Sequence, residues 1–191
     1  DKGTSFWTGN TSIEITGAYA CPNCNSSGFN LNEKTVTGKY VGEFEGVNVF
    51  ETKNLDSLVT PESDGYYHYR AVTVPERGII AGEGVFTSGL RAGQAMMQHE
   101  CGHILLYRMF GRPAYWHVIA PESFANATFF PSSHHKYWTE TWANYLAKGH
   151  FRGLWIGGVD YPIKNISTFN WWKMKLAQMQ GMMMAKPRGF I

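Results

Sequence analysis

Residues 98–103 read Gln-His-Glu-Cys-Gly-His and lie in a segment whose apolar residues repeat with helical spacing. His99 and His103 are four positions apart, so on an α-helix their imidazoles lie on one face, about one turn apart. Both rings can then bind a single metal ion, while Glu100 stands beside it as a general base. The spacing therefore predicts a metal centre built on a helix.

Zinc is the metal that this pattern predicts, in a site with an open position. Structural zinc sites usually have four protein ligands with several thiolates, whereas catalytic sites have three protein ligands and leave a position for water. The alternative is a surface helix that carries two solvated histidines. The apolar character of the segment opposes this alternative, because burying two histidines and a carboxylate without partners is costly.

The motif helix is expected over residues 90–110. Ser88 is a candidate N-cap, and the sequence Gly111-Arg112-Pro113 is a stop signal. Gly102 precedes the second histidine, and its missing side chain allows another segment to pack closely beneath the metal. A glycine inside a helix lowers its stability by about 1 kcal/mol relative to alanine. We therefore interpret Gly102 as a position where another segment packs closely against the helix.

A second helix, expected over residues 138–148, supplies the third ligand in this interpretation. Its periodicity places four residues on one face, namely Glu140, Ala143, Asn144 and Ala147. The small alanines allow a neighbouring helix to approach, and the flanking tryptophans would bury the carboxylate at a cost that a metal charge can offset. We therefore assign Glu140 as the third ligand.

Rival residues remain open for two of the roles at this site. Glu122 is a rival carboxylate ligand, and His134 or His135 is a rival imidazole ligand. His134 is also our candidate for the donor that stabilises the developing oxyanion, since a turn before the second helix would bring it to the edge of the metal. His135, Tyr137 and Tyr145 are the alternatives for that donor.

Strand signals precede the motif helix. A short strand is expected at residues 12–16, a hairpin or two short strands within residues 35–52, and further extended segments at residues 66–74 and 78–87. We expect residues 79–86 to form a sheet edge that pairs with an extended substrate. The alternative for that segment is an ordinary glycine-rich strand.

The remaining segments carry weaker signals. Prolines at 113, 121 and 131 exclude one long helix between the two motifs, where a short helix is expected near residues 123–128. An amphipathic helix is expected over residues 167–180. Cys21 and Cys24 form a lone C-x-x-C, for which a local disulfide or two free thiols is the default and a zinc knuckle or redox pair the alternative.

The totals exclude several classes of function. A chain of 191 residues is expected to form a single domain over residues 1–191, with a β-rich part at residues 1–75 and a catalytic core at residues 76–191. The 17 basic and 15 acidic residues show no basic run typical of nucleic-acid binding. No apolar run approaches the ~20 residues of a membrane span, so no stable membrane insertion is expected.

The order of the motifs resembles the zincin metallopeptidases whose third ligand is a glutamate on a later helix. One subgroup is closer: the metallopeptidase-like domain at the C-terminus of bacterial RHS-repeat and other polymorphic toxin proteins. Three motifs carry this resemblance, which covers residues 94–151: His-Glu-x-Gly-His at 99–103, Ala-Pro-Glu-Ser at 120–123, and His134-x-x-x-Trp138-Thr139-Glu140-x-x-Ala143-Asn144.

The resemblance implies an α+β, zincin-like fold in which a small mixed sheet packs on the active-site helix and a second helix carries the third ligand. It implies Zn²⁺ as cofactor, a protein or peptide as substrate, and an immunity protein as partner. The protein would be a peptide-hydrolysing effector that is secreted or delivered into a target cell. The alternatives are a hydrolase of peptidoglycan crosslinks with the same site, or a catalytically inactive zinc-stabilised binding or structural module.

Overall fold

The computed structural model describes residues 38–53, 55, 71–164 and 167–184. Within these residues the fold is α+β, with a four-stranded mixed sheet and several helices. The expected strand at residues 12–16 and the cysteine pair Cys21 and Cys24 lie outside the described residues. None of the helices in the described part is long and apolar enough to cross a membrane.

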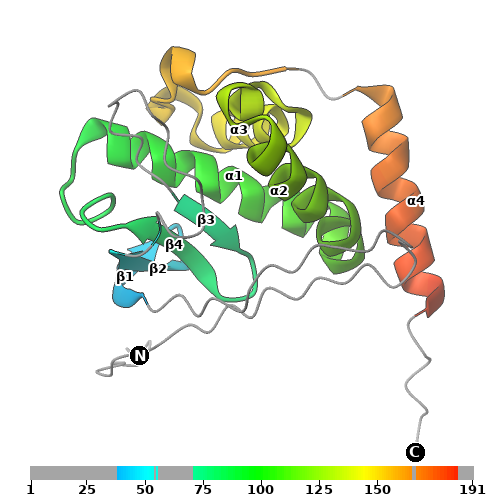
Figure 1. Ribbon diagram of the computed structural model, residues 1–191, viewed down its shortest axis with the longest axis horizontal. Helices are drawn as coiled ribbons and strands as arrows, with labels where there is room; N and C mark the ends of the chain where they lie inside the picture. The colour runs from blue at the N-terminus through cyan, green and yellow to red at the C-terminus, as the bar shows by residue number, and fades with distance from the viewer. Residues whose placement is uncertain (1–37, 54, 56–70, 165–166, 185–191) are drawn as a thin grey trace, which may run out of the picture.

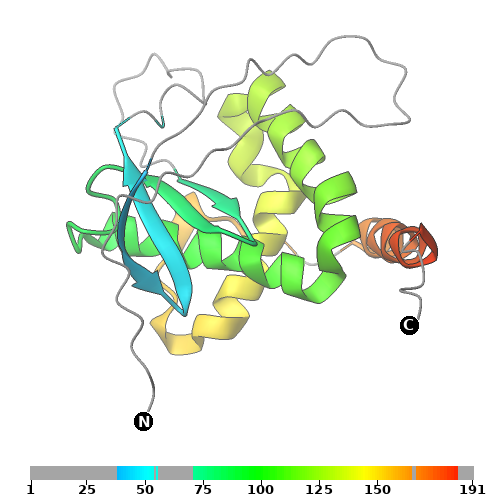
Figure 2. The same ribbon diagram turned by 90° about the horizontal axis from the view of Figure 1, so that it is seen from below.

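The longest helix, α1 (Arg91–Ala114), runs through the centre of the structure (Figure 1). The sheet packs on one side of it, and α3 (Trp138–Phe151) crosses it on another. The last helix, α4 (Thr168–Met184), lies at the end of α1 away from the sheet, as the second view also shows (Figure 2). Helix α1 is therefore the element on which the others are assembled.

The sheet has the strand order β1-β2-β4-β3. Its strands are β1 (Lys39–Phe44), β2 (Val47–Thr52), β3 (Ala71–Val74) and β4 (Gly78–Gly82). The predicted hairpin is confirmed, because β1 pairs with β2 in antiparallel register. Strand β4 pairs in parallel with β2 and antiparallel with β3, so the sheet is mixed.

Strand β4 is an interior strand, and the expectation that residues 79–86 form a substrate-binding edge is wrong. Ile79 and Ala81 are fully buried against Met97 of α1, while Ile80 packs into a second apolar cluster on the other face of the sheet. A strand that is apolar on both faces is typical of a sheet interior. The expectation rested on the position of this segment next to the motif helix, which does not show which strands pair with it.

The extended segment expected over residues 78–87 ends at Gly82, because Glu51 holds the following residues in a turn. One carboxylate oxygen of this side chain accepts hydrogen bonds from the backbone N–H groups of Phe86 at 2.7 Å and Thr87 at 2.9 Å, and the other accepts the Thr87 hydroxyl at 2.9 Å. Burial raises the pKa of Glu51, but these hydrogen bonds outweigh burial and lower it. The ionised carboxylate thus positions the turn that leads into α1.

The sequence predicted the break near the C-terminal end of α1 but not the residue that caps its N-terminal end. The helix begins at Arg91, and its N-cap is Leu90, which makes no side-chain cap. The prediction of Ser88 as N-cap is therefore wrong; its hydroxyl accepts the Leu90 N–H at 3.3 Å within the preceding turn. The predicted stop is confirmed as a break, since Gly111 has the non-helical angles φ 79° and ψ 168°.

Beyond that break the chain is more helical than its prolines suggested. A π-helical turn, η2 (Tyr115–Ile119), leads into α2 (Ala120–Phe129), which confirms the expected short helix near residues 123–128 and extends it at both ends. Pro113 lies in the first turn after the break, and Pro121 lies in the first turn of α2 after the wider π-turn. A missing N–H is tolerated at such positions because it has no intrahelical acceptor there.

Helix α3 extends past its expected end at residue 148 to Phe151, and ends where Arg152 adopts φ 47°. Helix α4 forms over the segment in which an amphipathic helix was expected. A buried cluster joins the three helices: it contains Phe110 of α1, Trp142 of α3 and Met174 of α4. This cluster fixes α3 across α1 at the level of the histidine motif.

Candidate metal centre

Helices α1 and α3 bring the three predicted ligands together. Candidate ligand atoms of His99, His103 and Glu140 all lie within 4.8 Å of one another. The Oε2 atom of Glu140 is 3.3 Å from Nε2 of His99 and 3.2 Å from Nε2 of His103. All three residues are buried, with 8%, 8% and 5% of their surface exposed. Two imidazole nitrogens and a carboxylate oxygen thus converge on one point in the interior.

Gly102 is the residue that permits this convergence. A Cβ atom at that position would lie 2.1 Å from the carbonyl oxygen of Ala143 on α3, a distance that no carbon atom can occupy. Ala143 and Ala147, on the facing side of α3, are fully buried. The small residues on both helices therefore let the two backbones touch, and Glu140 projects from the contact toward the histidines.

Asn144 determines which nitrogen of His99 faces the cluster. Its side-chain Nδ2 donates to the carbonyl oxygen of Pro162 at 2.9 Å, so its Oδ1 is the atom turned toward the imidazole. That oxygen lies 2.7 Å from Nδ1 of His99, which must therefore carry a proton. Nε2 is then the nitrogen that faces Oε2 of Glu140, and it is the atom that would bind a metal ion once its proton has left.

Glu140 is oriented by a second pair of hydrogen bonds. Its Oε1 accepts the Ser123 hydroxyl at 2.7 Å and the Thr139 hydroxyl at 2.8 Å. Its other oxygen, Oε2, is the one that faces the two histidines. The carboxylate is therefore held with one oxygen satisfied by hydroxyl groups and the other presented to the cluster.

Glu100 is also buried, and its partner comes from the sheet. The Thr73 hydroxyl, on β3, lies 2.6 Å from Oε2 of Glu100 and 3.1 Å from its backbone carbonyl oxygen. Only 3% of Glu100 is exposed. Its charge helps to raise the pKa of His99, so this carboxylate acts electrostatically on the cluster.

The electrostatics of the cluster follow from its close charges. Burial lowers the pKa of His99, but the hydrogen bond to Glu140 and the charges of Glu100 and Glu140 outweigh burial and raise this pKa to about 9. Burial raises the pKa of Glu140, whereas the charge and hydrogen bond of His103 dominate and hold it well below its usual value. The carboxylate is thus ionised and concentrates negative charge where a cation would bind.

His134 lies at the edge of the cluster, on the 3₁₀ turn η3 (Pro131–Lys136). Its Nε2 is 3.6 Å from Oε1 of Glu140, and its Nδ1 is 3.1 Å from Oδ1 of Asn126. Burial and the nearby His103 and His99 lower its pKa, against the opposing effect of Glu140. The structure therefore brings His134, the predicted oxyanion donor, to the edge of the group formed by the three predicted metal ligands.

The rival residues lie elsewhere or face other partners. Glu122 pairs with Lys173 and accepts the indole N–H of Trp138 at 2.8 Å and the Tyr137 hydroxyl at 3.2 Å. These contacts join α2, α3 and α4, so this carboxylate and Tyr137 are used in packing. His135 and Tyr145 are both exposed, which separates them from the buried cluster.

Cys101, the cysteine within the motif, is not a member of the cluster. It packs with Ala147 and Phe151 on another face of α1. Burial raises the pKa of its thiol to about 11, and a neutral thiol is a poor metal ligand.

Three residues beside the site were not singled out from the sequence. They are Thr73, which contacts Glu100, Ser123, which contacts Glu140, and Tyr161, whose ring lies 5.4 Å from that of His99. Ser123 belongs to the Ala-Pro-Glu-Ser motif, which was a usable signal. Thr73 and Tyr161 carried none, because their approach depends on how β3 and the segment after α3 fold back on α1.

The donor set fits zinc. Zinc accepts carboxylates and imidazoles as ligands, the latter after loss of the proton on the ligating nitrogen, and three protein ligands leave an open position. The hydrogen bonds that Asn144, Ser123 and Thr139 make to His99 and Glu140 are of the type that orients metal ligands in proteins.

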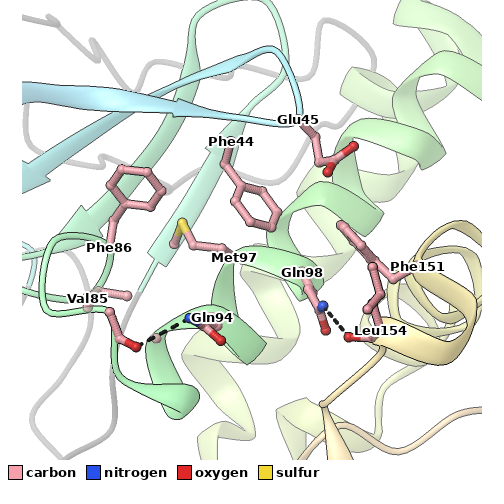
Figure 3. A pocket seen from close by; sticks show the side chains of 11 residues that line it. Phe44, Glu45, Val85, Phe86, Gln94, Met97, Gln98, Phe151 and Leu154 are labelled. Atoms are coloured by element: carbon pink, nitrogen blue, oxygen red, sulfur yellow. Dashed lines mark hydrogen bonds between the residues drawn. The ribbon is translucent and has the colours of Figure 1, made fainter.

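The cleft shown in Figure 3 is separate from this cluster. It has a volume of about 330 Å³ and is lined by apolar side chains that include Phe44, Phe86 and Met97. Gln98 borders it and donates to the carbonyl oxygen of Leu154 at 2.7 Å. None of the cluster residues lines it, so the donor atoms, rather than this cavity, identify the functional site.

Comparison of the chain with protein families, with curated proteins and with solved structures finds no match.

Proposed function

We propose that this chain is a zinc-dependent metallopeptidase with a zincin-like fold, and that it is the toxin or effector domain of a larger secreted bacterial protein. One observation carries the enzymatic part of the proposal. His99, His103 and Glu140 direct one donor atom each to a common point, with Glu100 buried beside them. The assignment to a toxin rests on the motif resemblance, and the substrate would be a protein or peptide of the target cell.

The chain's own residues would hold zinc through His99, His103 and Glu140. Zinc in such a site supplies Lewis-acid chemistry, since it polarises a carbonyl group and lowers the pKa of water to about 7. Asn144 keeps the Nδ1 proton on His99, and the Ser123 and Thr139 hydroxyls hold Glu140. These residues fix the directions of the His99 and Glu140 donors before the substrate arrives.

Glu100 would take the proton of the attacking water and later deliver it to the leaving amine. Burial keeps this carboxylate away from bulk solvent, and Thr73 on β3 limits its rotation. A fixed carboxylate within reach of the attacking water is what general base catalysis requires. His134 would stabilise the negative charge that develops on the carbonyl oxygen, because it lies on the accessible side of the cluster.

The decisive experiment measures metal and turnover in the same preparations. Wild-type protein purified without chelator should contain one zinc ion per chain and cleave peptides identified in a proteome-wide cleavage survey. Glu100→Gln should keep its zinc and lose turnover, because the base is removed while the ligands remain. His134→Ala should keep zinc and turn over roughly 100-fold more slowly, the usual effect of losing one oxyanion donor.

Each contrary outcome identifies a different error. A chain without zinc or a similar divalent ion would refute the metal centre. Turnover that survives in Glu100→Gln would place the base elsewhere, and zinc loss in His134→Ala would make that histidine a ligand. Cleavage of purified peptidoglycan but of no protein would favour the crosslink hydrolase, whereas bound zinc without any hydrolysis would favour a binding or structural module.

A further inference from the structure

Helix α4 exposes a continuous apolar stripe. Phe169, Trp172, Leu176 and Met179 follow one another at intervals of three, four and three residues, and their exposed fractions are 76%, 57%, 56% and 55%. This spacing places all four side chains on one face of the helix. Single exposed apolar residues are common on proteins, but a stripe along an entire helix marks an interaction surface.

The opposite face of α4 attaches the helix to the rest of the protein. Met174 is fully buried in the cluster with Phe110 and Trp142, and Lys173 pairs with Glu122 of α2. The helix is therefore anchored on its inner side, at the end of α1 away from the sheet (Figures 1 and 2). Its outer stripe, Phe169, Trp172, Leu176 and Met179, is available to a partner.

The charges around the stripe indicate what kind of partner this is. Helical periodicity places Lys173 on one flank of the stripe and Lys175 on the other; Lys173 pairs with Glu122, and Lys175 packs over the rings of Phe110 and Trp171. Helix α4 contains no acidic residue. The last 31 residues of the chain hold five of its 17 basic residues and none of its 15 acidic ones. The preceding part thus carries 12 basic and 15 acidic residues. Positive charge is concentrated at the end of the chain that contains the stripe.

We propose that the outer face of α4 docks on an anionic lipid surface, with the helix lying in the plane of the interface. An apolar face that is rich in large aromatic residues, with basic residues along its edges, is the composition of helices that lie on such surfaces. Phe169 and Trp172 would enter the boundary between headgroups and acyl chains, and the positive charge of residues 161–191 would be attracted to the anionic headgroups. Pairing of two α4 helices is less favourable, because it would bring together two copies of a segment, residues 161–191, that carries five basic and no acidic residues.

Sedimentation of the full chain with lipid vesicles tests this proposal. The protein should bind vesicles that contain about a third phosphatidylglycerol in phosphatidylcholine, and bind pure phosphatidylcholine vesicles much more weakly. Higher salt should weaken the binding, because the basic residues act through screened charges. Phe169→Ser and Leu176→Ser should each lower the partition coefficient roughly tenfold, since each withdraws one large apolar side chain from the interface.

Phe130→Ser is the matched control. Phe130 is 61% exposed but lies on the turn after α2, outside the stripe, so this variant should bind vesicles as the wild type does. Circular dichroism should show that all three variants retain the wild-type fold, as expected for exposed positions. Equal binding of wild type and stripe variants would overturn the proposal. So would a wild type that binds no vesicles, or a dimer in solution that the stripe variants convert to monomers.

Discussion

At the scale of single residues, the candidate metal centre is a set of donors whose directions are determined by their neighbours. His99 is oriented by Asn144, Glu140 by Ser123 and Thr139, and Glu100 by Thr73. Such outer hydrogen bonds typically change metal affinity or activity by about 10- to 100-fold when they are removed. The neighbours of the ligands are therefore part of the site.

Glu140 and Glu122 form a matched pair for testing the third ligand. Glu140→Gln should weaken zinc binding at least tenfold and abolish turnover, because an amide is a much weaker ligand than a carboxylate. Glu122→Gln should change neither, since this side chain faces Lys173 and Trp138 instead of the histidines. Zinc titration by calorimetry and a peptide cleavage assay measure both effects. Zinc bound equally well by both variants would exclude Glu140 as a ligand.

The proton on His99 makes the stability of the metal-free protein depend on pH. Its pKa is raised from 6.5 to about 9 in the folded state, so the folded state holds this proton more tightly than the unfolded state does. The resulting stabilisation is complete below about pH 6.5 and is lost as the pH rises through about 9. Urea unfolding in chelator over this range should therefore show falling stability.

Two controls separate this effect from general alkaline denaturation. The variant His99→Gln should show no such loss over the same range, because the titrating group is absent. The zinc-loaded protein should show the opposite trend, since protons compete with zinc for the imidazole and this competition weakens as the pH rises. A metal-free wild type whose stability is constant across the range would contradict the assignment.

At the scale of elements, the contact between α1 and α3 determines whether a metal centre can form. Gly102 and Ala143 allow the two backbones to touch, and the apolar cluster around Phe110 and Trp142 holds the crossing. The sheet contributes through β3, which carries Thr73 to the far side of Glu100. Each of the three elements therefore supplies one part of the same site.

The glycines of α1 and α3 provide a test of this contact. Gly102→Ala should destabilise the protein by about 1–3 kcal/mol and lower zinc affinity, because the added Cβ would force the helices apart. Gly149→Ala should stabilise it by about 0.5–1 kcal/mol, because that glycine is helical and a Cβ there meets nothing within 4 Å. Urea unfolding of both variants gives the comparison. Equal effects would mean that the helix crossing is not tight at Gly102.

At the scale of the whole molecule, a metal bound by His103 and Glu140 would join helices α1 and α3. These two residues are 37 positions apart in the sequence. A ligand present at 100 times its Kd stabilises the folded state by about 2.7 kcal/mol. For a chain of this size that corresponds to a rise in Tm of about 5–10 °C. Thermal unfolding with zinc and with chelator should differ by this amount.

The matched variant for this measurement is His103→Ala. It removes one of the two imidazoles and should reduce the zinc-induced rise in Tm to near zero. The Tm measured in chelator should change less than the Tm measured with zinc. A zinc-induced rise in Tm that persists in this variant would show that zinc binds elsewhere on the protein, for example nonspecifically to surface histidines.

The sequence by itself determined the features that depend on local periodicity. The four-residue interval places His99 and His103 on one face of α1, and the small residues beside Glu140 mark the side of α3 that contacts it. The break at Gly111 and the β1–β2 hairpin are likewise local, because they follow from backbone preferences over a few residues. The α+β composition followed from these segments.

The tertiary structure decided the features that depend on distant pairing. Strand order cannot be derived from the composition of one strand, so β4 was assigned to an edge although it lies in the interior. The contacts of Thr73 with Glu100 and of Ser123 with Glu140 also required knowledge of which segments return to α1. Since the cost of closing a loop changes only slowly with its length, sequence separation does not reveal which residues will meet, and packing of the whole chain selects them.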